Sequence, residues 1–278
     1  MLDILDYRFM QLALVAAVFT GLAAPAVGTY MVQRRLALLG DGLGHVALTG
    51  VALGLLSGTA PLLTALVVAV LGAVLIEVLR SYTRTSGDVA LAMLFYGGIA
   101  GGVLLIGFAD ESAATLNRYL FGSITTVEPG DVVVVSLLGV LVVVLCLVLS
   151  PQLFAVCQDE EHARVAGVPV RLYGLLIAVL AAATITVAMR TVGLLLVSAL
   201  MVVPVAAAQQ VARSFRTTHL LAMAIGLVTA VAGVVVSFEA DTAPGPTIVV
   251  LALAAFALAA AARAVTVGAR RRRSVPSA

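Results

Sequence analysis

Residues 36–56, LALLGDGLGHVALTGVALGLL, place one acid and one histidine inside an otherwise apolar stretch. The stretch is about as long as the ~20 residues with which an α-helix crosses a bilayer. Asp41 and His45 lie four residues apart, so on a helix their side chains share one face. A carboxylate and an imidazole there can bind one divalent cation. The alternative is a helix-start aspartate at the lipid headgroups beside a histidine satisfied in the core.

The composition places this stretch in a membrane protein. The chain has 278 residues, of which 62% are hydrophobic and 11% are charged, and its mean hydropathy is +1.17. Its long apolar runs exceed what a soluble domain of this size carries. A net charge of +2 is too small to suggest a nucleic-acid partner. Cys146 and Cys157 have no metal-type spacing, and a disulfide framework is not expected.

Nine apolar segments predict an all-α, polytopic membrane bundle of about nine transmembrane helices that forms a single domain over residues 1–278. Glycines crowd the second segment, where small residues allow neighbouring backbones to approach closely. Pro204 is expected to bend the seventh. The nine predicted spans are 9–30, 38–56, 62–79, 89–108, 132–149, 172–189, 192–211, 220–238 and 247–262.

The distribution of arginines predicts the orientation in the cell membrane. Of the 16 basic residues, all arginines, about 13 fall in loops assigned to the cytoplasm and three, Arg8, Arg118 and Arg190, fall outside or near it. Cytoplasmic loops carry such an excess in membrane proteins. We therefore expect the N-terminus outside and the C-terminus in the cytoplasm, with net acidic outer loops that favour an arriving cation or a basic docking surface.

A polar segment between the fifth and sixth spans is too short to cross the membrane. Residues 159–167, DEEHARVAG, begin with acids and end with an arginine and a glycine, the order that a short helix prefers. We interpret the segment as a helix that lies on the cytoplasmic face, available to a partner, although an ordinary amphipathic connector fits the same residues. His162 and His219 fall in cytoplasmic segments and are expected to be solvated.

Several catalytic motifs are absent from the sequence. It contains no Gly-x-x-x-x-Gly-Lys-[Ser/Thr] loop, so the chain does not itself use ATP in that way. It also lacks His-Glu-x-x-His and Gly-x-Ser-x-Gly, which argues against a metalloprotease or a serine hydrolase. An intramembrane enzyme that uses His45 with Ser198 lacks catalytic spacing. The sequence therefore favours a transport protein that is not an enzyme.

Three segments together resemble the membrane permeases of ABC importers for manganese, zinc and iron. The first runs through residues 34–54, the second through 119–127, and the third from 159–171 to 189–200 and Pro204. A looser similarity to iron-siderophore and vitamin B12 permeases is visible in the second and third. One departure is Gly44, because many members have a serine just before the histidine, and this puts a secondary hydroxyl contact in doubt.

The resemblance implies a homodimeric permease of the type II importer kind, with a pathway between the two copies. It implies an extracytoplasmic metal-binding protein outside, an ATPase pair in the cytoplasm, and no permanently bound cofactor, the divalent metal ion being cargo. In the family an Asp and a His bind the metal in transit, and they match Asp41 and His45. The coupling helix that sits in the ATPase groove matches 159–167, with Asp159, Glu160, Glu161, Ala163, Arg164 and Gly167.

Two other transport functions stay open at the level of sequence. One is a permease for a metal chelate such as an iron-siderophore, whose bulky ligand needs an apolar cavity rather than Asp41 and His45. The other is a self-contained secondary cation carrier, which requires more intramembrane charge than this chain has. An Asp and a His together suit zinc, manganese and iron(II), so the sequence does not select the metal.

Overall fold

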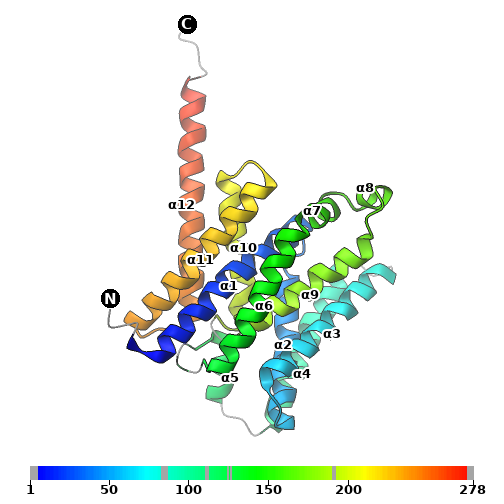
Figure 1. Cartoon of the computed structure of the whole chain (residues 1–278), viewed down its shortest axis with the longest axis vertical. Coiled ribbons are helices and arrows are strands. Elements are labelled where there is room, and N and C mark those ends of the chain that lie inside the picture. Colours follow the sequence, from blue (N-terminus) through cyan, green and yellow to red (C-terminus); the bar gives the residue numbers. More distant parts are fainter. Residues whose placement is uncertain are drawn as a thin grey trace.

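The computed structural model describes residues 6–82, 87–109, 113–123, 125, 127–189 and 192–273, and its long elements there are all α-helices, as predicted. Figure 1 shows them as one bundle with a projecting C-terminal helix. In chain order the helices are α1 (Arg8–Gln33), α2 (Leu39–Ser57), α3 (Pro61–Tyr82), α4 (Gly87–Phe108), α5 (Ala113–Phe121), α6 (Pro129–Val148), α7 (Ser150–Gln158), α8 (Glu160–Val165), α9 (Val170–Ala188), α10 (Leu194–Val211), α11 (Phe215–Glu239) and α12 (Pro244–Arg273).

Eight helices in the described ranges are long and apolar enough to cross a membrane: α1, α2, α3, α4, α6, α9, α11 and α12. The predicted seventh span corresponds to α10, a shorter apolar helix that contains Pro204. About nine spans were predicted, and the difference lies in the length of this one helix. Arg190, which the predicted topology placed near the outer side, lies outside the described residues.

Helix α1 occupies the centre of the bundle and runs antiparallel to α11. At one end the ring of Tyr7 lies 5.9 Å from that of Phe238, and at the other the ring of Tyr30 lies 5.5 Å from that of Phe215. Between these ends Gly226 packs against Pro25 so closely that an added β-carbon would lie 2.3 Å from the proline ring. Small residues therefore bring the two helices into direct backbone contact.

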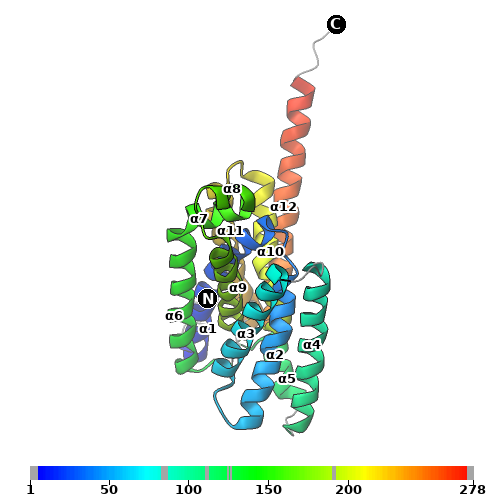
Figure 2. The ribbon, with the colours of Figure 1, turned by 90° about the vertical axis from the view of Figure 1, so that its right-hand side faces the viewer.

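Helix α2 packs against α3, α4 and α10, and Figure 2 shows α2, α3 and α4 as neighbours. Glycines make these contacts possible. A β-carbon added to Gly98 of α4 would lie 2.7 Å from the backbone of His45, and one added to Gly50 would lie 2.6 Å from Ala65 on α3. The far side of α4 leaves large apolar side chains exposed, among them Tyr96 and Leu104.

The chain gathers polar contacts at the end of the bundle where α7 and α8 lie, which is also the end from which α12 projects (Figure 1). The end of α1 meets α7 through a hydrogen bond from Gln33 to Gln158 of 2.9 Å. Arg263 of α12 donates a hydrogen bond of 3.1 Å to Gln210 at the end of α10. Four of the arginines assigned to the cytoplasm, Arg34, Arg35, Arg213 and Arg263, lie at this end of the bundle.

The expectation for His219 is wrong. Its side chain is only 3% exposed, and its ring lies 5.3 Å from that of Tyr30 and 6.0 Å from that of Phe215. Helix α11 begins at Phe215, so residue 219 lies one turn inside the helix, on the face that packs against α1. His162 is exposed on α8, as expected.

Candidate functional site

Asp41 and His45 lie in the first two turns of α2, and both are half-buried. Their spacing places them on one face of this helix, as predicted. Asp41 belongs to the first turn, where the unsatisfied backbone N–H groups and the helix dipole favour a negative charge. No side chain caps this helix start. The fold thus places an acid in the first turn of a helix that has no side-chain cap.

The start of α2 lies inside the bundle rather than at its end. A β-carbon added to Gly40 would lie 3.2 Å from Cβ of Ser198 and 3.7 Å from Sδ of Met201. The same Met201 meets Gly28 of α1, which precedes the end of that helix by more than a turn. The chain therefore turns back into the bundle after α1, and α2 starts at the depth where α10 crosses it.

Helix α10 supplies a third polar group. The hydroxyl of Ser198 donates a hydrogen bond to Oδ1 of Asp41, from a position 157 residues further along the chain. Gly44 allows the close approach, because an added β-carbon would lie 3.2 Å from the carbonyl oxygen of Leu194. A hydroxyl is therefore present beside the carboxylate, although the residue before His45 is a glycine.

Helix α4 holds the ring of His45. The rings of His45 and Phe95 make an edge-to-face contact. Their centroids are 4.4 Å apart, and the angle between the ring planes is 79°. Behind them, the β-carbon that Gly98 lacks would lie 2.7 Å from the carbonyl carbon of His45. The aromatic contact and the close helix packing limit the orientations of the imidazole.

The polar groups at the start of α2 are too few to form a complete set of ligands for a metal ion. Among the described residues, no cationic side chain forms an ion pair with Asp41. Over the same residues, no group of three or more His, Cys, Asp and Glu side chains is placed to hold a metal ion. Asp41 and His45 thus offer one carboxylate and one imidazole, and Ser198 adds a hydroxyl oxygen beside the carboxylate. A cation held there would keep other ligands.

The predicted cytoplasmic segment forms the short helix α8. Asp159 is its N-cap and accepts hydrogen bonds from the backbone N–H groups of Glu161, at 2.9 Å, and His162, at 3.0 Å. Gly167 ends the turn with φ of +81°, a left-handed conformation that favours glycine. The carboxylate of Glu160 is ion-paired with Arg34 at the end of α1.

The predicted residues of this segment separate into two groups. Asp159, Glu160, Glu161, Arg164 and Gly167 are exposed. Ala163 is 0% exposed, because its methyl group packs against Val156 of α7 and Val170 of α9. Ala163 therefore packs α8 against α7 and α9, and its side chain is not available to a partner.

A model of the ABC 3 transport family matches residues 6–263 of the chain, a range that contains both the start of α2 and α8. The chain belongs to the ABC 3 transport family. The resemblance found in the sequence is thereby confirmed, and the chain is a permease subunit of an ABC transporter.

Two curated relatives and one solved structure are similar over most of the permease. The manganese import system permease protein ScaB of Streptococcus parasanguinis is 33% identical over 245 residues, covering 88% of this chain and 87% of ScaB. The high-affinity zinc uptake system membrane protein ZnuB of Haemophilus influenzae is 29% identical, covering 86% of this chain and 91% of ZnuB. A structure of PsaBC from Streptococcus pneumoniae in complex with Fab matches with a TM-score of 0.83 at 30% identity, covering 92% of each chain.

Two residues of this ABC 3 family permease contact predicted site residues without having been predicted as site residues themselves: Ser198, which bonds to Asp41, and Arg34, which pairs with Glu160. Ser198 was considered only as part of an enzyme, and Arg34 only as a mark of the cytoplasmic side. Val165 on α8 is 89% exposed, which is unusual for a valine and adds an apolar group to the acidic helix. Val165 lies within the predicted segment 159–167 but was not singled out among its residues.

Proposed function

We propose that this permease conducts a divalent transition metal ion, manganese, zinc or iron, into the cytoplasm as part of an ATP-driven importer. The observation that carries the proposal is the pair Asp41 and His45 on one face of α2, with the hydroxyl of Ser198 on the carboxylate. The manganese and zinc systems to which ScaB and ZnuB belong support this choice of cargo.

The chemistry of the pair suits a site that a metal ion passes through. An acid inside a membrane-spanning segment is costly, by roughly 2.5–3.5 kcal/mol at the helix centre on insertion scales, so an intramembrane acid indicates a functional site. Asp41 lacks a cationic partner within the described residues, and an arriving divalent ion supplies that positive charge. Two protein ligands leave the remaining positions to water or to a second copy of the chain. Such partial coordination binds the ion and also releases it.

The proposal includes the partners and the orientation of the permease. An ATPase pair docks on α8 from the cytoplasm, and an extracytoplasmic metal-binding protein delivers the ion to the opposite end. A second copy of the chain forms the other wall of the pathway. The clustering of arginines at the α8 end of the bundle supports an N-terminus outside and a C-terminus in the cytoplasm.

The test separates metal binding from structural support by replacing Asp41 in two ways. Asp41→Asn keeps an oxygen that accepts the bond from Ser198 but removes the charge, whereas Asp41→Ala removes both. If the carboxylate binds the ion, both variants and His45→Ala reduce uptake of radioactive manganese, zinc and iron to background in proteoliposomes that contain the complete importer.

Membrane levels of the three variants, measured on the same preparations, control for assembly. Wild-type uptake by Asp41→Asn would mean that the acid serves only the packing of α2 against α10. Wild-type uptake by His45→Ala would mean that the imidazole is not a ligand of the transported metal ion. The wild-type complex, compared across the three metals, identifies the cargo.

A further inference from the structure

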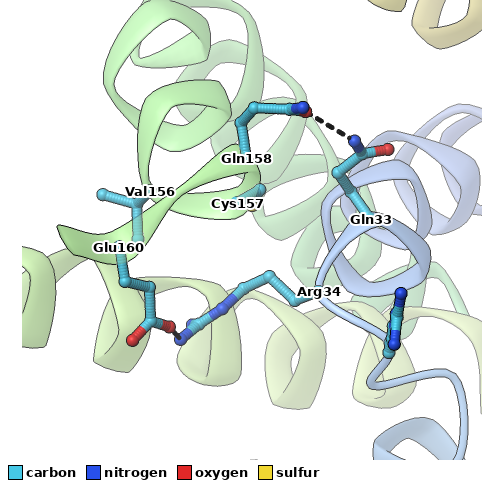
Figure 3. A pocket seen from close by; sticks show the side chains of 7 residues that line it. Gln33, Arg34, Val156, Cys157, Gln158 and Glu160 are labelled. Carbon is cyan, nitrogen blue, oxygen red and sulfur yellow. Dashed lines mark hydrogen bonds and ion pairs between the residues drawn. The ribbon is translucent and has the colours of Figure 1, made fainter. Parts of the chain in front are cut away.

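We propose that Arg34 is a positioning residue that joins the coupling helix α8 to the helix that carries Asp41 and His45. This inference rests on the proposed function, because it assigns a route from the ATPase surface to the metal site. The relevant contacts lie where α1 ends, at a cavity of about 440 Å³ shown in Figure 3.

Arg34 is buried although it lies at the polar end of the bundle. Its side chain is 6% exposed, whereas the side chain of its partner Glu160 is 48% exposed. The residue forms the C-cap of α1, and its backbone N–H bonds to the carbonyl of Tyr30 at 3.0 Å. The guanidinium of Arg34 therefore extends from a hydrogen-bonded backbone position to the carboxylate of Glu160 at the surface.

The two terminal nitrogens of the guanidinium face different parts of the molecule. Nη2 pairs with Oε1 of Glu160 on α8. Nη1 is buried without a hydrogen-bond partner among the described residues, and it points toward Gly174 on α9. A β-carbon at Gly174 would lie 3.1 Å from this Nη1 and would overlap the carboxylate of Glu77 on α3. A planar, rigid guanidinium thus lies where α1, α3, α8 and α9 meet.

Two neighbouring contacts fix the same junction. Gln33, the residue before Arg34, donates a hydrogen bond of 2.9 Å to Gln158, and the thiol of Cys157 lies 3.7 Å from the carbonyl oxygen of Tyr30. Figure 3 shows Gln158 and Glu160 facing Gln33 and Arg34 across the cavity. The end of α1 is therefore attached to the α7–α8 segment at three successive points.

The chain leads directly from this junction to the metal site. Arg35 has a left-handed φ of +58°, and α2 starts at Leu39, so Asp41 follows Arg34 by only seven residues. A displacement of Glu160 by the ATPases moves the guanidinium with it, because breaking the ion pair of a buried cation is unfavourable. That movement reaches the start of α2 through a short connector.

Arg35 provides a matched control for this role. It is the next residue, carries the same charge and lines the same cavity, but it is exposed and forms no ion pair with another described residue. If charge near the membrane surface is what matters, Arg34→Gln and Arg35→Gln have equal effects. If the bond to Glu160 matters, only Arg34→Gln and Glu160→Gln affect coupling.

The experiment measures metal ions transported per ATP hydrolysed by the complete importer in proteoliposomes. We expect Arg34→Gln and Glu160→Gln each to lower this ratio by about fivefold or more, the lower end of the range for coupling between sites. We expect Arg35→Gln to leave the ratio unchanged. The double variant Arg34→Gln/Glu160→Gln is expected to lose no more than either single variant, because one interaction is removed only once.

Two results overturn the inference. One is an equal ratio for Arg34→Gln and Arg35→Gln, and the other is a double variant in which the two losses multiply. Because Glu160 is half-exposed, Glu160→Gln assembles even if removal of Arg34 does not. The proposed function fails in a different measurement, when Asp41→Asn and His45→Ala transport metal at the wild-type rate.

Discussion

The start of α2 and the end of α1 each join distant parts of the chain through a single carboxylate, but with opposite electrostatics. At the start of α2, Asp41 accepts a bond from a neutral hydroxyl on α10. At the end of α1, Glu160 faces the buried cation of Arg34. One carboxylate lacks a cation among the described residues, and the other is paired with one supplied by the protein itself.

The difference agrees with the two roles proposed above, a metal-binding site at the start of α2 and a connection that transmits movement at the end of α1. A carboxylate whose charge is neutralised by the protein gains little from a passing metal ion, whereas one that is held only by a hydroxyl gains much. The surroundings agree with this division. Glycines pack around Asp41 and His45 and leave few polar groups near them, while hydrogen bonds and an ion pair connect α1 with α7 and α8.

The largest effect is expected from filling the glycine contact behind His45. In Gly98→Val the added carbons collide with the backbone of His45, and the α2–α4 contact must open. Overpacking of this kind costs about 1–3 kcal/mol, so we expect loss of uptake together with a lower thermal midpoint. Gly97→Val is the control, because nothing lies within 4 Å of a β-carbon at Gly97. Equal losses in both variants would show that His45 does not depend on this packing.

A smaller effect is expected from removing the hydroxyl that holds Asp41. Ser198→Ala leaves both proposed ligands in place but frees the carboxylate to rotate. Partners of this kind typically change metal affinity by about 10–100-fold, so we expect the metal concentration at half-maximal uptake to rise by about tenfold. The maximal rate and the membrane level should change little. An unchanged concentration dependence would mean that Ser198 contributes nothing to the site.

The smallest effect is expected in cysteine labelling, where the two native cysteines should not react. Burial raises the pKa of Cys157 to about 12, so its reactive thiolate is scarce at pH 8, and Cys146 is also buried. We expect no labelling of the folded wild-type permease by a membrane-impermeant maleimide. Because the native cysteines do not react, an introduced cysteine can be followed alone. Asn117→Cys should react from the outer side of intact cells, and Arg164→Cys only after the membrane is permeabilised. Labelling of Arg164→Cys in intact cells would contradict the predicted topology and place α8 on the outer side of the membrane.

What the sequence predicted well depends on neighbours in the chain. The positions of the spans follow from apolar runs, and the shared face of Asp41 and His45 follows from helical spacing. The short helix α8 follows from the acids at its start and the arginine and glycine at its end. Each of these properties is decided within a few residues. Ser198 could not be assigned in this way, because its partner lies 157 residues away and a serine in an apolar helix ordinarily bonds to its own backbone.

The same limit explains the errors in the polar segments. Ala163 belongs to a charged helix but packs inward, because a helix of this size has one face on the protein whatever its composition. His219 belongs to a segment flanked by arginines but faces α1, and only the tertiary packing reveals that face. Arg34 was one of thirteen arginines that marked a side, and nothing in the sequence distinguished it from Arg35.

The low hydropathy of α2 has a consequence for how the protein is made. Of the eight helices in the described part of the chain that are long and apolar enough to span a membrane, α2 has the lowest hydropathy. The glycines that let its neighbours approach are also residues that contribute little to its partitioning into lipid. The helix that carries the proposed metal site is thus the least apolar of these eight, and we expect its insertion to depend on the arrival of α3 and α4 during synthesis.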